Sequence, residues 1–192
     1  METLQLRISW LVDGLPESAG IAARPPQISD EVVKSLADLG FNKPRIACES
    51  VTSLAVKKAR SAQNHVEFEV PVMFGDSIVR LRGQGGVELI ADGRYVVGLR
   101  LAIVQPIETE DNSFGGGSGG TQFREDSIRG SIATALGHYT VLGTSVVIPP
   151  PKKAGSGPVQ YPSAFVVQLK RARDFPAGGG DSRGQESVDR RR

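Results

Sequence analysis

Apolar and polar residues alternate over much of this chain of 192 residues, and the alternation predicts β-strands. In the first segment the residues at positions 4, 6, 8, 10 and 12 are all apolar, which is the pattern of a strand with one buried face. Further runs of this kind, each bounded by Gly, Asp-Gly or Pro, cover residues 65–74, 77–82, 87–91 and 95–104. Asp92-Gly93, between the last two runs, is a strong signal for a β-hairpin.

One segment has the spacing of a helix instead. Ser29 suits the N-cap position, and Asp30 and Glu31 place negative charge in the first turn, where the helix dipole favours it. Apolar residues follow at helical spacing, and Gly40 tolerates the left-handed conformation that is common just after a helix. We therefore expect a helix over residues 30–39.

Residues 44–62 fit both a helix and a strand. Their composition suits an amphipathic helix, whereas the β-branched pair Val51-Thr52 and the start at Pro44 favour an extended chain. We predict a strand here, with residues 57–64 as the turn that follows it.

The region from Thr121 to Leu169 predicts two long strands folded on each other, then a loop that opens with three prolines, then a returning strand. The turn between the two long strands falls at Gly137-His138. Almost no side chain in this region can do covalent chemistry. We therefore expect this region to act through strand pairing and its surface rather than through a catalytic pocket.

These elements predict an α+β fold that is predominantly antiparallel β, in one β-rich domain over residues 1–173. A division into smaller lobes at 1–62 and 63–173 is the alternative. Residues 108–120 are acidic and then rich in Gly and Ser, so we expect a flexible loop between two strands. Residues 174–192 have almost nothing to bury and predict a disordered C-terminal tail.

The formal net charge is small and sits mainly in the C-terminal segment. The chain has 23 Lys and Arg against 21 Asp and Glu, which gives +2. Seven basic and four acidic residues lie from Lys170 onward, so the preceding part carries −1. A nucleic-acid-binding domain concentrates basic charge on a folded face, so we expect no nucleic-acid partner for the folded body.

The sequence also limits the compartment and the ways in which the fold is held together. Cys48 is the one cysteine, which excludes an intramolecular disulfide and a cysteine-based zinc site. No window approaches the roughly 18 apolar residues of a transmembrane helix, and the first residues lack the pattern of a signal peptide. As written, the sequence predicts a soluble cytoplasmic chain.

Groups suited to catalysis or metal binding are few and scattered. His65 and His138 lie far apart in sequence, and neither has a carboxylate beside it at metal-ligand spacing. Glu67 and Glu69 share one face of a strand, which we take as its solvent face. Gly83-Gln84-Gly85-Gly86 precedes no helix that would hold a phosphate, so we interpret it as a turn between strands. Cys48 is expected to be an inert buried thiol. We predict no catalytic residue, no cofactor and no metal site.

Several segments resemble bacterial secretins, the channel proteins of type II and type III secretion. The segments at 4–14 and 29–40, and a strand that begins at Arg45, are similar to the small ring-building βα domains of that family. GLRLAIVQP at 98–106 and SAFVVQLKRA at 163–172 resemble strands of the secretin β-domain core. The segment between them resembles the family's Arg/Ser-rich strand and the apolar strand after it, through Arg124, Ser127, Ile128, Thr134, Gly137, Thr140, Val141, Leu142 and Gly143.

The resemblance implies a stand-alone secretin-like domain rather than a channel, and a periplasmic location where it holds. We expect a non-enzymatic structural or assembly protein that associates with itself, or with an envelope or secretion partner, through strand edges. The candidate interface residues are Val96, Gly98, Arg100, Arg124, Asp126 and Arg129.

Two other classes of function remain open. One is a β-sandwich that binds a small ligand or carbohydrate through the stacking groups Trp10, Phe114 or Tyr161. The other is an enzyme in which folding assembles Glu67, Glu69, Asp126 and His138.

Overall fold

Strands dominate the described part of the chain, as the alternation predicted. The computed structural model describes residues 2–15, 29–56, 64–74, 77–90, 93–107, 122–148 and 159–172. The strands are β1 (Glu2–Asp13), β2 (Pro44–Val56), β3 (Asn64–Phe74), β4 (Ser77–Leu89), β5 (Tyr95–Ile107), β6 (Gln122–Thr134), β7 (Tyr139–Val147) and β8 (Tyr161–Arg171), and the helix is α1 (Asp30–Asp38). The expected α+β fold with predominantly antiparallel strands is confirmed.

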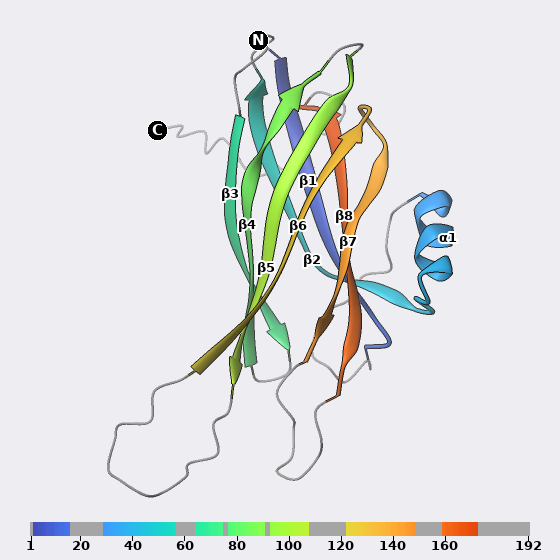
Figure 1. Ribbon diagram of the computed structural model, residues 1–192, viewed down its shortest axis with the longest axis vertical. Coiled ribbons are helices and arrows are strands. Elements are labelled where there is room, and N and C mark those ends of the chain that lie inside the picture. The colour runs from blue at the N-terminus through green and yellow to red at the C-terminus, as the bar shows by residue number, and fades with distance from the viewer. Residues whose placement is uncertain are drawn as a thin grey trace, which may run out of the picture.

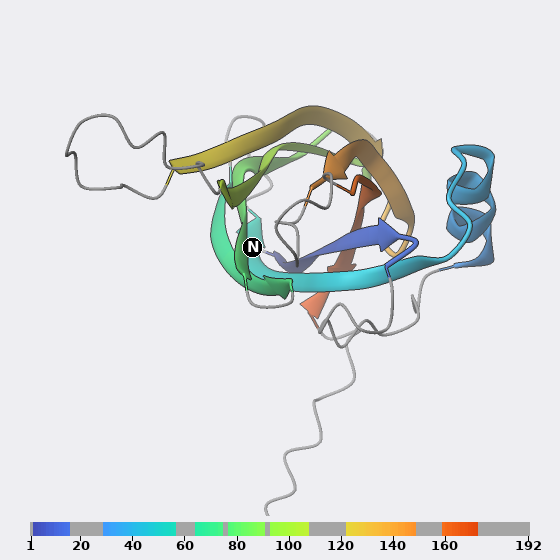
Figure 2. The same ribbon diagram turned by 90° about the horizontal axis from the view of Figure 1, so that it is seen from below.

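The strands form two four-stranded sheets that curl around a shared interior (Figures 1 and 2). Sheet A has the order β2-β1-β8-β7, and sheet B has the order β3-β4-β5-β6. All neighbouring strands are antiparallel. The expectation that the strands on either side of Gly137 fold on each other as a pair is wrong, because β6 pairs with β5 and β7 pairs with β8. The chain crosses from one sheet to the other at this point.

Alternating side chains from both sheets fill the interior. Along β1 and β5, every second residue is apolar and at most 3% exposed: Leu4, Leu6, Ile8, Trp10, Val12, Tyr95, Val97, Leu99, Leu101 and Ile103. The ring of Trp10 stacks on that of Phe165, with centroids 6.2 Å apart and planes 16° apart. Burying each large apolar side chain contributes about 1.5–3 kcal/mol, so this shared core is the main source of stability.

Helix α1 covers part of the outer face of sheet A. Val32 and Leu36, on one side of the helix, pack with Leu11 of β1 and the outward side chains of β8. The buried Asp13 carboxylate accepts hydrogen bonds from the backbone N–H groups of Asn42 and Lys43 at 2.5–3.1 Å, which fixes the connection from the helix to β2. The predicted helix is therefore confirmed.

Helix α1 lacks a side-chain cap at its N-terminus but ends at the expected glycine. Ser29 is the N-cap residue, but its side chain makes no capping hydrogen bond. Gly40 has φ +89°, as its predicted role at the end of the helix requires. The helix thus begins and ends where the sequence indicates, and its packing on sheet A rather than a side-chain cap holds it in place.

The predicted turn at residues 83–86 is wrong, because these residues lie inside the continuous strand β4. A Cβ atom at Gly83 would overlap the ring of Phe68, and one at Gly85 would overlap the backbone carbonyl of Gly98. The glycines are thus needed for close packing within the sheet, because any side chain would collide with a neighbour.

The strand preferred for residues 44–62 is confirmed as β2, which contains a β-bulge opposite Trp10 and Leu11. Of the turn predicted at 57–64, Asn64 begins β3 and the rest lies outside the described residues, as do the loop at 108–120 and the C-terminal tail at 174–192. The hairpin predicted at Asp92-Gly93 is confirmed by the antiparallel pairing of β4 with β5. There Gly93 has φ +71°.

Candidate functional site

The outer face of sheet B carries a regular array of side chains that point away from the core. The register places residues of all four strands side by side at each level. Three successive levels read Glu67–Gln84–Arg100–Arg129, Glu69–Arg82–Ala102–Ser127 and Pro71–Arg80–Val104–Glu125. Helix α1 lies on the other sheet, so no described helix covers this face (Figures 1 and 2).

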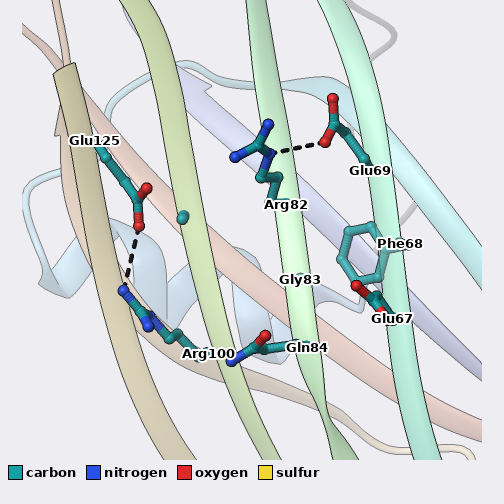
Figure 3. Close-up of a pocket in the computed structure, with 9 residues that line it drawn as sticks. Glu67, Phe68, Glu69, Arg82, Gly83, Gln84, Arg100 and Glu125 are labelled. Carbon is teal, nitrogen blue, oxygen red and sulfur yellow. Dashed lines mark hydrogen bonds and ion pairs between the residues drawn. The ribbon is translucent and has the colours of Figure 1, made fainter. Parts of the chain in front are cut away.

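A hollow of about 510 Å³ lies in the middle of this face (Figure 3). Glu67 and Glu69 of β3 border it on one side and Glu125 of β6 on the other, while Arg82 and Arg100 reach in from the central strands. The hollow is shallow, and its lining is mostly charged or polar. It therefore lacks the enclosed apolar wall with a few polar groups that is typical of small-molecule sites.

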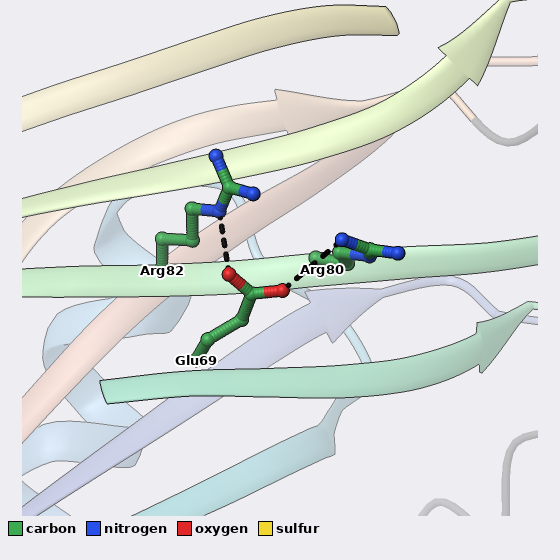
Figure 4. A network of polar contacts seen from close by, with 3 residues as sticks. All are labelled: Glu69, Arg80 and Arg82. Carbon is green, nitrogen blue, oxygen red and sulfur yellow. Dashed lines mark hydrogen bonds and ion pairs between the residues drawn. The ribbon is translucent and has the colours of Figure 1, made fainter. Parts of the chain in front are cut away.

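Cross-strand ion pairs hold most of these charges. Glu69 lies 2.7 Å from Arg82 and 3.3 Å from Arg80 (Figure 4), and Arg100 lies 3.2 Å from Glu125. All five side chains are between 42% and 51% exposed. Exposed pairs of this kind contribute at most about 1 kcal/mol each, so they order the face more than they stabilise the fold.

In the part of the chain that the structure describes, two charged residues at opposite edges of the face make no close ion pair with an arginine or carboxylate across the strands. The Glu67 carboxylate is 76% exposed and lies 3.6 Å from His65. Arg129 is exposed and lies directly opposite Arg100, so two like charges meet across the strands. Within the described residues Arg129 has no ion pair. Both edges of the face can therefore accept a charged partner group from outside.

An apolar row crosses one end of the same face. It consists of Met73, Ile78 and Phe123, which are 50%, 51% and 58% exposed, together with Pro106. Met73 lies opposite Ile78, and Pro106 lies opposite Phe123. The pairing of β4 with β5 ends at Arg80 and Val104, and Ile78 and Pro106 lie just beyond this last pair. Contiguous exposed apolar side chains mark interaction surfaces more often than single ones do.

The structure divides the six candidate interface residues between two faces. Val96, Gly98, Arg100 and Arg129 lie on the outer face of sheet B. Arg124 and Asp126 have the opposite orientation: their register neighbours are Gln105 and Ile103, which point inward.

Arg124 and Asp126 instead form a polar cluster at one end of the interior. The Arg124 Nε atom lies 2.8 Å from the Asp126 carboxylate, and the Gln105 Nε2 atom donates a hydrogen bond of 3.4 Å to the same group. Gln105 is 2% exposed, and its Oε1 atom has no hydrogen-bond partner within the described residues. These groups therefore satisfy one another in part and do not form an outward surface.

The residues considered for catalysis are not brought together. Glu67 and Glu69 lie on the outer face of sheet B, Asp126 points inward from β6, and His138 lies in the connection between β6 and β7. Within the described residues, no group of three or more His, Cys, Asp or Glu side chains could hold a metal ion.

The stacking groups considered for a carbohydrate are also poorly placed. Trp10 is fully buried and stacks on Phe165, so its use as a ligand platform is wrong. Tyr161 is half-buried against the core, and Phe114 lies outside the described residues.

Cys48 has the properties of a structural thiol. It packs against the core beside Trp10. Burial, and to a smaller extent the charge of Glu49, raise the pKa of the Cys48 thiol from 9.0 to about 12. The thiolate needed for nucleophilic chemistry is thus disfavoured.

The positions that carry the secretin resemblance meet where β6 and β7 pass each other. A Cβ atom at Gly130 would lie 2.9 Å from the Leu142 side chain, and one at Gly143 would lie 3.0 Å from that of Ile128. Gly137, with φ +86°, donates a hydrogen bond of 2.7 Å to the Leu169 carbonyl. This corner holds the two sheets together, so these residues have a structural role here.

The apolar row is the part of this face that the sequence analysis missed. In these strands apolar and polar residues alternate, and the polar positions face outward. Apolar side chains stand at three of those outward positions: Met73, Ile78 and Phe123. This break in the alternation could have been seen in the sequence. Phe123 is far in sequence from Met73 and Ile78, so only the strand order shows that the three lie at the same end of one face.

Comparisons with known proteins give a distant structural likeness. No protein-family model and no curated protein matches the chain. Among solved structures, the chain is similar to the secretin domain of InvG from the Salmonella SPI-1 injectisome, with 12% identity and a TM-score of 0.40. The alignment covers 94% of this chain and 66% of that one.

The chain is also similar to two GspD secretins. One comes from the pilotin–secretin AspS–GspD complex of ETEC and the other from the type II secretion system of E. coli K12, each with 12% identity and a TM-score of 0.31. The alignments cover 88% and 90% of this chain, and the chain spans about half of each GspD, 48%. This degree of likeness establishes neither family membership nor function. Separately, none of the described helices has the length and apolar character needed to cross a bilayer.

Proposed function

We propose that this chain is a non-enzymatic structural or assembly protein of secretin-like type, which associates with itself or with another protein of the cell envelope or secretion apparatus. The observation that carries the proposal is the outer face of sheet B. It is uncovered by any described helix, it is ordered by cross-strand ion pairs, and it ends in an exposed apolar row. Protein interfaces use both apolar contacts and polar groups, and this face offers both.

The sheet edges support the same proposal. β2, β3, β6 and β7 each have a described partner strand on one side only. A strand with an unpaired edge can add a strand from another chain through backbone hydrogen bonds. β6 packs beside β7, and β2 lies beside β3 in the same way, so strand addition can use only those parts of the four edges that the facing strand leaves uncovered.

The choice of an envelope or secretion partner rests on the sequence resemblance alone. A periplasmic location belongs to the same proposal, and it depends on the same segments. A cytoplasmic assembly protein would use the same faces and edges. The physical part of the proposal, association through sheet B or through strand edges, is therefore testable without knowing the compartment.

The direct test is light scattering coupled to size exclusion over a hundredfold range of protein concentration. We expect a discrete multimer whose population rises with concentration. A chain ending at Ala172 is the matched control, because it retains the ion pair of 2.7 Å between Arg171 and Glu2 that ties β8 to β1. A multimer that survives this truncation supports association through the sheets. A monomer at every concentration contradicts self-association, and the proposed function is then binding to a different protein.

A further inference from the structure

We infer that helix α1 is a lid, which detaches from sheet A as a unit while the two sheets stay folded, and that the apolar surface under it binds an amphipathic helix of a partner protein. The inference rests on the proposed function in the form of binding to another protein, and it names the surface and the kind of partner. Two observations carry it: few contacts hold α1 in place, and the surface that α1 covers is suited to a helix.

Apolar contacts alone hold the helix on the sheet. Of its nine residues, Val32 and Leu36 are buried and the rest are exposed. Among the residues that the structure describes, no hydrogen bond or ion pair joins residues 30–38 to a strand. The side-chain hydrogen bond that this segment does make, from the Ser35 hydroxyl to the Glu31 carbonyl, lies within the helix. Two buried side chains are therefore the attachment of α1 itself.

The chain is fixed more firmly just after the helix. Phe41 is buried in the same cluster as Leu36. The backbone N–H groups of Asn42 and Lys43 then donate hydrogen bonds to the buried Asp13 carboxylate of β1. This clamp lies outside the helix, so it persists when α1 detaches. The segment that opens, which we call the lid, therefore covers residues 30–41.

The contacts under the lid are separate from the core that the two sheets share. They form a cluster of six buried residues, three from the lid and three from strands: Val32, Leu36 and Phe41, and Leu11, Ala164 and Val166. The adjacent residues Trp10 and Phe165 belong to the interior core on the other side of sheet A. Successive side chains of a strand face opposite ways, so loss of the lid removes no contact from the interior.

A detached α1 does not remain a helix. Isolated helices shorter than about 12–15 residues are marginal in water. This helix has nine residues, and the Ser29 side chain does not cap it. Detachment and unfolding of α1 are thus one step. Segments with few buried apolar contacts open in this way at a lower free energy than the whole domain does.

The surface under the lid is an apolar patch on the outer face of sheet A. Every strand of the sheet contributes to this patch, which we call the seat: Leu11, Ile46, Tyr139, Val141, Ala164 and Val166. The register sets Leu11 between Ile46 and Ala164, and it sets Val141 beside Val166. An open lid exposes these contiguous apolar side chains to water, which a bound apolar partner prevents.

The helix that occupies the seat shows which partner fits it. α1 places its two buried side chains at i and i+4, the spacing by which amphipathic helices dock on apolar surfaces. A partner helix with the same spacing makes the same contacts, and one that is longer than α1 buries more apolar surface. The lid and the partner therefore compete for one surface, and α1 keeps the seat covered until a partner is present.

Hydrogen exchange of the full-length protein tests whether the lid opens alone. We expect the amides of α1 to share one opening equilibrium and to be protected at least roughly a hundredfold less than those of β1 and β5. Exchange of the α1 amides only together with those of the two strands overturns the lid.

A matched pair of double substitutions in the helix tests what holds the lid closed. Val32→Asp with Leu36→Asp places two charges against the seat, whereas Val33→Asp with Ala37→Asp places them at the same spacing on exposed positions. We expect the first pair to abolish protection in α1, to leave β1 and β5 protected, and to raise the binding of the dye ANS roughly fivefold. The second pair should leave ANS binding unchanged. Unfolding of both sheets in the first variant overturns the lid.

A synthetic peptide of residues 29–42 tests the seat as a binding site. We expect the peptide, at concentrations up to about 2 mM, to shift the NMR signals of Leu11, Val141 and Val166 in the full-length Val32→Asp, Leu36→Asp protein. The control is a peptide that carries the same two aspartates, which should shift none of them. Absence of a shift with the unchanged peptide overturns the seat as a site for a partner helix.

These outcomes are distinct from those that test the proposed function. A multimer in light scattering, in a protein whose α1 exchanges only with the sheets, overturns the lid and leaves self-association standing. A monomer at every concentration, with a lid that opens and a seat that binds the peptide, supports this inference and contradicts only self-association.

Discussion

The two sheets share one core, but their outer faces differ in how much of them the rest of the chain covers. On sheet A, helix α1 buries Leu11 and Val166, and the outward Ser9 and Gln168 are 1% and 2% exposed. On sheet B, the side chains at equivalent outward positions are mostly exposed, and the large apolar ones Met73 and Ile78 are about half exposed. The helix thus covers the middle of sheet A, where Val51 and Val146 on the edge strands stay 48% and 38% exposed, whereas no described helix covers sheet B.

This difference separates residues that maintain the fold from residues that are available for association. Outward groups of sheet A have partners inside the chain, such as the 3.0 Å hydrogen bond from the Ser9 hydroxyl to Glu49. The outer face of sheet B offers charge and apolar surface that contribute little to stability. Substitutions should therefore affect the free energy of unfolding strongly in the core and under α1, and weakly on the outer face of sheet B.

The largest expected effect lies in the core that both sheets share. Trp10→Ala removes a fully buried ring that stacks on Phe165 and should lower the free energy of unfolding by about 3–5 kcal/mol. Urea denaturation measures the loss, with Val51→Ala, at an exposed position of β2, as the control. A loss below about 1 kcal/mol would mean that Trp10 is not part of a packed core and would revive its use as a ligand platform.

The next effect tests how firmly sheet A is covered. Asp13→Ala leaves the backbone N–H groups of Asn42 and Lys43 without their carboxylate acceptor, and hydrogen bonds to a charged group contribute about 1.5–3 kcal/mol. We expect a loss in that range. Hydrogen exchange should also become faster in α1 than in sheet B. Lys34→Ala, on the exposed side of the helix, should change the unfolding free energy by less than about 0.5 kcal/mol.

Within sheet B, two glycines give a matched test of close packing. A Cβ atom at Gly85 would overlap the backbone of Gly98, whereas one at Gly98 would lie 4.0 Å from its nearest neighbour, the Ser131 hydroxyl oxygen. We expect Gly85→Ala to cost about 1–3 kcal/mol and Gly98→Ala to cost little. Equal costs in thermal or urea unfolding would contradict the tight backbone approach between β4 and β5.

A smaller effect should appear only at alkaline pH. Burial and then the Glu49 charge raise the pKa of Cys48 from 9.0 to about 12, so the folded state favours the protonated thiol. This contribution is complete below pH 9 and is lost as the pH rises from 9 toward about 12. Between pH 8 and pH 10 the unchanged protein should lose about 1 kcal/mol relative to Cys48→Ala. Parallel stability curves for the two proteins would contradict a buried thiol.

The sequence predicted the local elements and their faces better than their partners. The two-residue period identified the strands and the outward position of Glu67, because side-chain direction alternates along any strand. Sheet membership depends on contacts distant in sequence, so the corner at Gly137 looked like the turn of a hairpin. The glycine run at 83–86 has the local composition of a turn, but Phe68 and Gly98 require it within a strand.

The candidate site was predicted only in part for the same reason. Arg100 and Arg129 were chosen from separate strands, and the structure places them opposite each other on the outer face. Arg124 and Asp126 alternate with Arg129 along β6, so they point inward where Arg129 points outward. The sequence alone does not say which of the two sets faces the core. Met73 and Phe123 lie at the same end of one face because of the strand order β3-β4-β5-β6, which no local pattern in the sequence predicts.

The smallest expected effect is the sharpest test of the comparison between the sheets. Glu69→Gln removes both ion pairs with Arg80 and Arg82, but the Glu69 side chain is 42% exposed and each arginine is 48% exposed. Water and salt screen such pairs, so the loss should be below about 1 kcal/mol and should shrink further in 1 M salt. Urea denaturation at two salt concentrations measures it beside Asp13→Ala. If Glu69→Gln costs as much as Asp13→Ala, the outer face of sheet B maintains the fold as sheet A does, and its charges are not available for association.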